Sequence, residues 1–400
     1  MTLEVTCFNS LDALLKLYDE WRLLCIENRS DIYFHPLWVS NWWKHFGSGR
    51  SFLAYVVREN GRLVAVLPFY MELTPPKILN LRLARLCGPI HYFAVFRLPI
   101  DECLTSQVLE LVLNTFAANK QAHFLCFQSL SESGEAWPEL LGAERLLPAG
   151  FAIIQEKLDD HTLIPMQSSF EKFLSGLSRK RRVKYRKAKD YLEQSLGIST
   201  KYLSGIEAEA FLPKFVHMHS EQWLRNGNAG HFSDWPLSME FYRNVLRDFG
   251  PEEKGRFYVQ YNAEGRILAA QFCFVHAGNC VALLTARDMS AEVRQLGIGF
   301  YAQMERIQTL IEEGVCRIDS GTGLYDHKLS LNAEMTSLHR ILINRNDWLT
   351  LLRLRLVLRW ADLLDLLYYR VWFIKLAPRW RRLTGAKPKP LWQAWIKTRL

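Results

Sequence analysis

The segment RQLGIGFYAQMERIQTLIEEG, residues 294–314, begins with a base and two glycines and continues as an amphipathic helix. The first turn of a helix presents unpaired main-chain N–H groups and a partial positive charge, which together attract anions. Glycine carries no side chain, so an anion can approach the main chain closely. We therefore expect a diphosphate site formed by Arg294, Leu296, Gly297, Ile298, Gly299 and Phe300. The alternative is that both glycines only turn the chain or pack the helix against a sheet.

Two further groups of residues are of types that could bind a ligand. The segment RKRRVKYRKAK, residues 179–189, is strongly basic, and Arg182 and Arg186 share one helical face. These bases could contact the phosphates of a ligand, or they could form a solvated surface. His217 and His219 would point about 200 degrees apart on a helix, so they cannot share one metal ion there. We expect no metal site.

A sheet must hold the head of the helix at 294–314. The segments GRFYVQY, RILAAQFCFV and CVALLTARD are rich in β-branched and aromatic residues, and the turn formers NAEG and HAGN separate them. This pattern predicts an antiparallel meander. Phe300, Met304, Ile307 and Ile311 have the spacing of one helical face. Gly314 ends the helix, and VCRIDSG and SLHRILINR read as further strands, so the predicted class is α+β with a mixed sheet.

A repeated pattern indicates that this sheet has a counterpart earlier in the chain. YVVRENGRLVAVLPFYMEL from Tyr55 and YVQYNAEGRILAAQFCFVHAG from Tyr258 both read as strand, turn ending in Gly-Arg, and strand. A chain of 400 residues also exceeds the usual size of one hydrophobic core. We therefore expect a duplicated domain, with bounds 1–165 and 166–348, followed by a tail at 349–400.

The composition, 49% hydrophobic and 23% charged, is that of a globular protein. Eight cysteines are scattered without a CxxC pair, and no signal peptide begins the chain, which predicts a reduced, cytoplasmic location. The net charge of +9 comes from residues 349–400, because the preceding residues are nearly neutral. A basic tail of this kind favours an anionic partner.

The tail has the pattern of an amphipathic helix. Its charged residues Arg355, Arg359, Asp362, Asp365 and Arg370 fall in one arc and leave a broad apolar face, while charges interrupt the roughly 20 apolar residues that a bilayer span needs. Trp380, Trp392 and Trp395 alternate with bases, a mixture suited to anionic headgroups. We expect 349–400 to contact an anionic membrane surface. The alternative is that the apolar face docks on the body of the protein.

Taken in order, these segments resemble the GNAT acyltransferases, and RQLGIG resembles the loop with which that family holds the CoA diphosphate. The run EEGVCRIDSGTGLYDHKLSLNA is similar to the Asp, Gly and Lys segment of the FemAB-like, cellulose-biosynthesis CelD-type acetyltransferases, which carry two GNAT domains in tandem. FHPLWVSNWWKHFG, GRLVAVLPFY and LSRKRRVKYRKAKDYLE resemble other parts of that branch. The resemblance implies two GNAT-like domains, and the basic helical extension lies beyond it. The helix heads of the first domain show no comparable loop with a base and glycines, so we expect CoA in the second domain only.

The resemblance places Gly299 on the family's loop glycine and Asp319, Gly323 and Lys328 on its Asp, Gly and Lys. His327 stands where a Tyr usually precedes the Lys, and Leu324 where an acidic residue is common, so the acceptor pocket differs from the usual one. Acyl transfer needs a base for the acceptor, a donor for the oxyanion and an acid for the thiolate. We expect these roles from Asp319, Tyr325, His327 and Lys328, with His327 as base, Tyr325 as acid, and Lys328 also contacting a substrate anion. Alternatively, Asp319 stabilises a turn and Lys328 is solvated.

The resemblance implies an enzyme that transfers an acetyl or longer acyl group from CoA to nitrogen or oxygen of a polar, anionic acceptor. That acceptor would be a precursor of an envelope polysaccharide or glycolipid, and Arg182, Arg186 and Lys328 would bind it. The expected location is the cytoplasm, with peripheral attachment to the plasma membrane. Two alternatives remain: a FemAB-type ligase that uses aminoacyl-tRNA, and a non-catalytic protein that binds membrane or nucleic acid. If the protein is a CoA-dependent acyltransferase, we expect no nucleic-acid partner.

Overall fold

The computed structural model describes residues 2–90, 93–225, 227–228, 230–234, 237–290, 293, 297–387 and 389. The chain divides into two compact units, each built from separate stretches of the chain. The first unit contains residues 1–161 and 336–369, and the second contains residues 162–335 and 370–394. The boundary falls inside two strands, β6 (Phe151–Pro165) and β12 (Glu334–Arg345). The domain bounds 1–165, 166–348 and 349–400 stay predictions.

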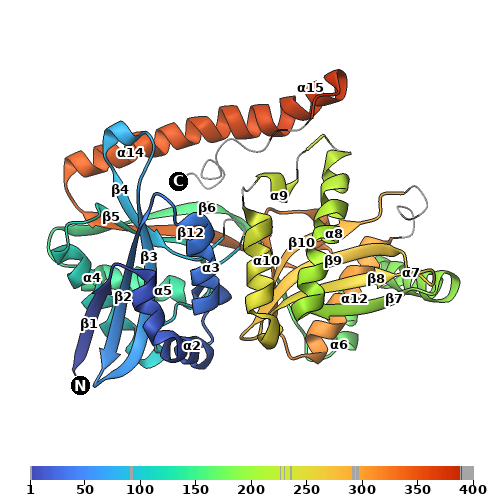
Figure 1. Cartoon of the computed structure of the whole chain (residues 1–400), viewed down its shortest axis with the longest axis horizontal. Coiled ribbons are helices and arrows are strands. Elements are labelled where there is room, and N and C mark those ends of the chain that lie inside the picture. Colours follow the sequence, from blue (N-terminus) through green and yellow to red (C-terminus); the bar gives the residue numbers. More distant parts are fainter. Residues whose placement is uncertain are drawn as a thin grey trace. The chain divides into compact units, whose positions relative to one another are not determined.

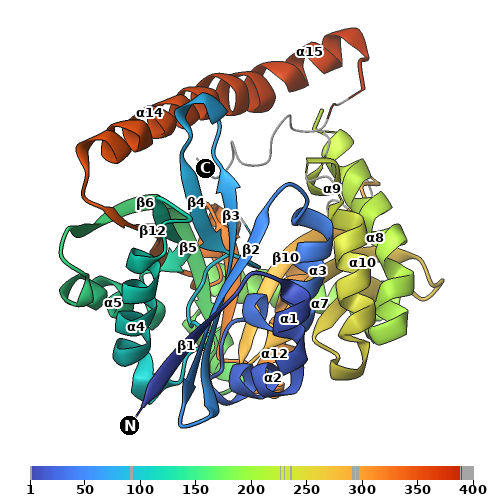
Figure 2. The same ribbon diagram turned by 60° about the vertical axis from the view of Figure 1, so that its left-hand side comes forward.

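The first unit is a sheet in the order β1-β2-β3-β4-β5-β12-β6. Its strands before β6 are β1 (Leu3–Phe8), β2 (Ser51–Glu59), β3 (Arg62–Leu73), β4 (Arg82–Leu86) and β5 (Phe124–Ser131). Its helices before β6 are α1 (Leu11–Leu14), α2 (Tyr18–Glu27), α3 (Pro36–Phe46), α4 (Thr105–Ala118) and α5 (Ala136–Gly142). Strands β1 to β4 pair antiparallel in sequence, and β5 runs parallel to β4. Figure 2 shows α2 and α3 on one face of this sheet and α4 on the other.

The second unit is a sheet in the order β6-β11-β10-β9-β8-β7. Its strands after β6 are β7 (Ser199–Ser204), β8 (Gly255–Tyr261), β9 (Ile267–His276), β10 (Asn279–Arg287) and β11 (Arg317–Thr322). Its helices are α6 (Phe170–Gly176), α7 (Arg179–Leu196), α8 (Gly205–Leu224), α9 (His231–Asp234), α10 (Ser238–Asp248), α12 (Ile298–Glu312) and α13 (Asp326–Leu329). Strands β7 to β10 pair antiparallel, and β11 runs parallel to β10. Figure 1 shows α8 and α10 on one face of this sheet and α12 on the other.

The two units repeat one design, as the paired hairpins predicted. Each unit has four antiparallel strands, β1 to β4 or β7 to β10, and helices lie in the chain between the first and the second of them. One further helix, α4 or α12, then leads to a fifth strand that runs parallel to the fourth. The hairpins are β2–β3 and β8–β9, and their turn glycines have φ of 87° at Gly61 and 76° at Gly265. Both values lie in the left-handed region that glycine adopts without strain. The predicted meander and the mixed, mostly antiparallel α+β fold are therefore confirmed.

Helix α12 packs on the sheet with a face slightly rotated from the predicted one. Tyr301, Met304, Ile307 and Leu310 are buried in the core of the second unit, whereas Phe300 and Ile311 pack at its margin. The buried set keeps a spacing of three residues, so the predicted helix is correct although its innermost side chains differ. This rotation turns Phe300 toward α7.

Helical turns continue from Trp348 to Thr384, as α14 (Trp348–Leu364), a π-helical stretch (Asp365–Leu376) and α15 (Ala377–Thr384). Leu354 and Val357 of α14 pack with side chains of β4, β5 and β12 in the core of the first unit. One apolar face therefore docks on the body. A second apolar row on α14 is exposed, and we call it the outer stripe: Leu349, Leu352, Leu356, Trp360 and Leu363. None of the helices that the structure describes has the length and hydrophobicity to cross a membrane.

Candidate functional site

The two parallel strands of the second unit pair over a short distance only. β10 and β11 are in register over residues 279–281 and 317–319. β10 then continues to Arg287, with a bulge between Val281 and Leu284, and within the described residues it pairs there with β9 alone. The other edge of β10 therefore offers main-chain groups that an extended ligand could pair with, as a peptide pairs with a sheet edge.

The head of α12 follows this edge along the chain. Gly297 is its N-cap, with φ of 72°, and its carbonyl accepts from the amides of Phe300 at 3.0 Å and Tyr301 at 3.1 Å. A Cβ added at Gly299 would meet no atom within 4 Å. Open space therefore lies beside the first turn, as an anion site at a helix head requires. Arg294 and Leu296 of the predicted site lie outside the described residues.

A partly buried polar network holds α7 against α12. The Tyr185 hydroxyl donates to Glu305 Oε1 at 2.8 Å, and the Tyr301 hydroxyl donates to Glu193 Oε1 at 3.0 Å. Lys189 Nζ lies between the carboxylates, 2.9 Å from Glu193 and 3.2 Å from Glu305. Burial and the adjacent carboxylates raise the pKa of both phenols, so they stay protonated donors. This network sets the rotation of α7 about its axis.

That rotation decides which bases of α7 reach the head of α12. Arg181 Cζ lies 5.5 Å and Lys184 Nζ 5.7 Å from the centroid of the Phe300 ring, and Lys184 Cε is the nearest atom to a Cβ built at Gly297. Arg182 instead donates to the carbonyls of Ser175 and Leu177, and Arg186 is exposed. Arg181 and Lys184 were not singled out from the sequence, because eight bases on one helix give no sign of which face meets a neighbour.

The end of β11 is held by Asp319 and Lys328. Asp319 is buried, and its Oδ1 accepts from the amide of Gly321 at 2.8 Å. Lys328 Nζ donates to the carbonyls of Gly321 at 3.1 Å, Thr322 at 2.8 Å and Gly323 at 3.3 Å. Three carbonyl oxygens match the three N–H donors of an ammonium group. The Lys328 ammonium therefore stabilises the turn that follows β11.

Tyr325 and His327 lie on the exposed side of the same turn. Their rings stack with centroids 5.6 Å apart and planes inclined by 21°, and Lys328 Nζ lies 5.2 Å from the Tyr325 ring centroid. Partial desolvation, followed by the Lys328 charge, lowers the pKa of His327 below its ordinary value. A lowered pKa keeps the imidazole neutral near pH 7, which is the form that accepts a proton. The structure thus brings all four predicted catalytic residues to one strand end.

The histidines of α8 point apart, as expected. His217 is exposed, with Nε2 3.8 Å from Glu221 Oε1, whereas His219 is buried, with Nδ1 2.9 Å from the Thr285 carbonyl. His219 Nε2 lies 3.0 Å from His231 Nδ1, a contact across the fold that the sequence did not indicate. Among the described residues, no group of three or more His, Cys, Asp or Glu side chains could hold a metal ion.

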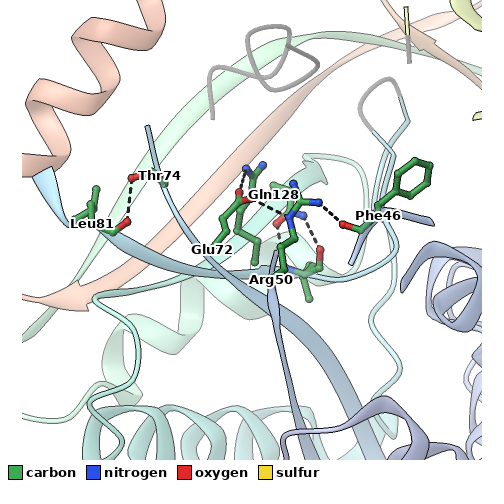
Figure 3. A network of polar contacts seen from close by, with 8 residues as sticks. Phe46, Arg50, Glu72, Thr74, Leu81 and Gln128 are labelled. Carbon is green, nitrogen blue, oxygen red and sulfur yellow. Dashed lines mark hydrogen bonds and ion pairs between the residues drawn. The ribbon is translucent and has the colours of Figure 1, made fainter. Parts of the chain in front are cut away.

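The first unit closes the corresponding strand edge with a side chain. β4 and β5 are in register over residues 83–85 and 124–126, again three pairs. Two residues beyond the last pair, Gln128 Nε2 donates to the Leu86 carbonyl at 2.9 Å and its Oε1 accepts from the Leu86 amide at 3.3 Å (Figure 3). The amide of Gln128 thus replaces a main-chain partner. In the second unit, Gly321 lies two residues beyond the last pair, and it has no side chain that could bond to the neighbouring strand.

Residues 179–329 match the family model described as the acetyltransferase (GNAT) domain. The match runs from the first residue of α7 to the last residue of α13, so it contains the bases of α7, the head of α12 and the end of β11. No curated protein matches the chain at a significant level.

Two solved structures share the fold over most of the chain. FemX is similar over 85% of this chain and 97% of its own, with a TM-score of 0.59 and 11% identity. The C-terminal domain of a candidate lysylphosphatidylglycerol synthetase from Agrobacterium fabrum is similar over 89% of this chain and 97% of its own, with a TM-score of 0.51 and 12% identity. At these identities the similarity concerns the fold.

The matched domain defines an acyltransferase. Residues 179–329 are its GNAT acetyltransferase domain, and the protein is an acyltransferase of the GNAT type. The resemblance to tandem GNAT and FemAB-like proteins is thereby confirmed.

Proposed function

We propose that the second unit transfers an acetyl or longer acyl group from CoA to a polar, anionic acceptor used in envelope polysaccharide or glycolipid synthesis. The observation that carries this proposal is the open space beside Gly299 at the head of α12. A diphosphate placed there would meet main-chain amides and the positive end of the helix. Arg181 and Lys184 on α7 add two charges at the same place.

From this anchor, the rest of the donor would extend along the free edge of β10. Its amide groups would pair with main-chain groups beyond the bulge at residues 281–284, where no β11 partner stands. The thioester would then lie near Asp319, the last residue of β11 that pairs with β10. The first unit does not offer this path because Gln128 occupies it. We therefore infer one donor site per chain.

At the strand end, the chemistry would use the exposed side chains. Neutral His327 would take a proton from the acceptor nitrogen or oxygen, which then attacks the thioester carbon. Main-chain N–H groups of β10 would stabilise the oxyanion, and the Tyr325 hydroxyl would protonate the departing thiolate. Asp319 and Lys328 would keep the turn in place by their contacts with Gly321 and its neighbours.

A direct test measures which donor the protein uses. We expect acetyl-CoA or a longer acyl-CoA to raise the melting temperature and to release free thiol when an acceptor is supplied, since ligands that bind the folded state stabilise it. Aminoacyl-tRNA serves as the comparison, because exposed bases such as Arg186 could also contact a nucleic-acid backbone. Stabilisation by aminoacyl-tRNA without any effect of acyl-CoA would replace the proposal with the ligase alternative.

We further propose that the outer stripe of α14 attaches the protein to an anionic membrane surface. Its apolar residues are exposed, and so are Arg355 and Arg359 on the same side of the helix. Leucine and tryptophan next to arginine suit the boundary between acyl chains and anionic headgroups. The buried face of α14, with Leu354 and Val357, would stay packed on the first unit while the outer stripe contacts the membrane.

We expect the protein to sediment with vesicles that contain phosphatidylglycerol and not with vesicles of phosphatidylcholine alone. The double variant Leu356→Ser with Trp360→Ser should bind such vesicles at least about tenfold more weakly, because burying one such side chain is worth about 1.5 to 3 kcal/mol. Leu23→Ser, at an exposed leucine of α2, is the matched control and should bind as the wild type does. Absence of sedimentation at low salt would remove the proposal.

A further inference from the structure

Three charged side chains in the first unit form a network in which the charges do not balance (Figure 3). Arg50, just before β2, has its Nε 3.0 Å from Glu72 Oε2 on β3. Arg85 on β4 has its Nη1 3.1 Å from Glu72 Oε1. The Arg85 side chain is 7% exposed, that of Glu72 19% and that of Arg50 31%. The network is therefore buried at Arg85 and reaches solvent at Arg50.

The network carries a surplus positive charge. Burial alone would raise the pKa of Glu72, but the charges of Arg85 and Arg50 outweigh burial and hold it below its ordinary value. Glu72 is thus ionised, and one carboxylate faces two guanidinium groups. Arg85 Nε is buried with no hydrogen-bond acceptor in the described part of the chain. A buried donor without a partner and an unbalanced buried charge both destabilise the folded state, so both need an explanation.

Aromatic rings hold Arg50 in position. Its Cζ lies 4.9 Å from the ring centroid of Tyr70, and the Tyr70 and Trp42 rings stack with centroids 4.9 Å apart. Arg50 Nη1 also donates to the Phe46 carbonyl. Its Nε and Nη1 are therefore engaged inward, whereas Nη2 has no acceptor among the residues that the structure describes. A guanidinium held in place with its Nη2 hydrogens free can donate charge-assisted hydrogen bonds to an oxygen of a carboxylate or phosphate group.

We propose that the first unit binds a small oxyanion, a carboxylate or a phosphate group, at Arg50, with Arg85 supplying the second positive charge. The oxyanion contacts the Arg50 Nη2 donors. Its negative charge balances the one positive charge of the two arginines that Glu72 does not neutralise. Trp42 and Tyr70 form the apolar wall beside it. This site belongs to the first unit and does not depend on donor binding at α12, so either proposal can fail without the other.

The competing explanation is that the network only joins β3 to β4. The two explanations differ in what removal of Glu72 does. If the network is structural, Glu72→Gln lowers stability and creates no affinity for anions. If it is a binding site, Glu72→Gln removes a competing carboxylate, so an added oxyanion binds more tightly and restores the lost stability.

The test is calorimetric titration of the full chain with inorganic phosphate and with acetate. We expect saturable binding by the wild type. Arg50→Gln should bind at least about tenfold more weakly, since charge-assisted hydrogen bonds are worth about 1.5 to 3 kcal/mol. Glu72→Gln should bind about tenfold more tightly. Arg58→Gln, whose partner on α2 is Glu20, is the control and should not change affinity. Circular dichroism verifies that each variant is folded.

A second arm identifies the source of the oxyanion. A hexose phosphate that binds more tightly than inorganic phosphate indicates that the group belongs to a saccharide acceptor, whereas equal affinities indicate a free anion. Arg50→Lys retains the charge without the planar donor pair and should bind with intermediate affinity. The proposal is overturned if neither wild type nor Glu72→Gln binds phosphate or acetate, or if Arg50→Gln binds as the wild type does.

Discussion

Replacing Gly299 by glutamate is expected to abolish the rise in melting temperature that acetyl-CoA gives to the protein. The new carboxylate would stand in the open space beside the first turn of α12, where the proposed donor places its diphosphate. Like charges brought together in this way cost several kcal/mol, so the dissociation constant should increase by about 100-fold or more. Thermal shift and equilibrium titration with acetyl-CoA and free CoA would measure the change.

Gly299→Ala provides the matched control. Its methyl group would meet no atom within 4 Å, and alanine favours a helix over glycine by about 1 kcal/mol, so the unliganded protein should be as stable as the wild type or more so. Gly297 is unsuitable for this purpose, because its φ of 72° would strain any other residue. If Gly299→Glu keeps the full response to CoA, the donor does not bind at this helix head.

Replacing Lys328 by methionine is expected to lower the free energy of unfolding by about 2 to 4 kcal/mol, because hydrogen bonds to charged groups contribute about 1.5 to 3 kcal/mol and are not additive. The ammonium holds three consecutive carbonyls, from Gly321 to Gly323, and methionine has no donor for any of them. Urea unfolding would measure the loss. The turnover rate should fall as the turn that carries His327 loses its position.

The dissociation constant for acetyl-CoA distinguishes this role from the ligand contact that the sequence predicted for Lys328. A lysine that stabilises the turn leaves that constant nearly unchanged, whereas a lysine that binds a ligand phosphate would weaken binding and leave stability intact. Lys187→Met, at an exposed lysine of α7, is the control for the loss of one positive charge. A stable Lys328→Met protein with weakened CoA binding would contradict the structural role.

Several features followed from local sequence because local interactions produce them. The glycines before Phe300, the three- and four-residue spacing through Ile311 and Gly314 after it are together enough to predict a helix with an open head. The hairpins from Tyr55 and Tyr258 could be recognised in the same way, since turn residues and strand residues are neighbours in the chain. The position of Asp319, Tyr325, His327 and Lys328 at one strand end follows from their closeness in sequence.

Other features depend on contacts between distant segments, and no local pattern encodes them. Tyr185 and Glu305 set the rotation of α7, and so decide that Arg181 and Lys184 rather than Arg182 and Arg186 face the head of α12. Gln128 closes the strand edge of the first unit only because Leu86 comes to lie opposite it. The network of Arg50 and Arg85 likewise joins β3, β4 and the residue before β2.

By itself, the sequence determined the two hairpins, the meander, the helix α12 and the repeat of the fold, because backbone hydrogen bonding and hydrophobic periodicity act over a few residues. The tertiary structure alone decided which side chains meet at each site. A charged side chain can reach several neighbours, and the packing of the buried faces selects among them. On α14 this packing buries Leu354 and leaves Leu356 exposed, although both are leucines of one helix.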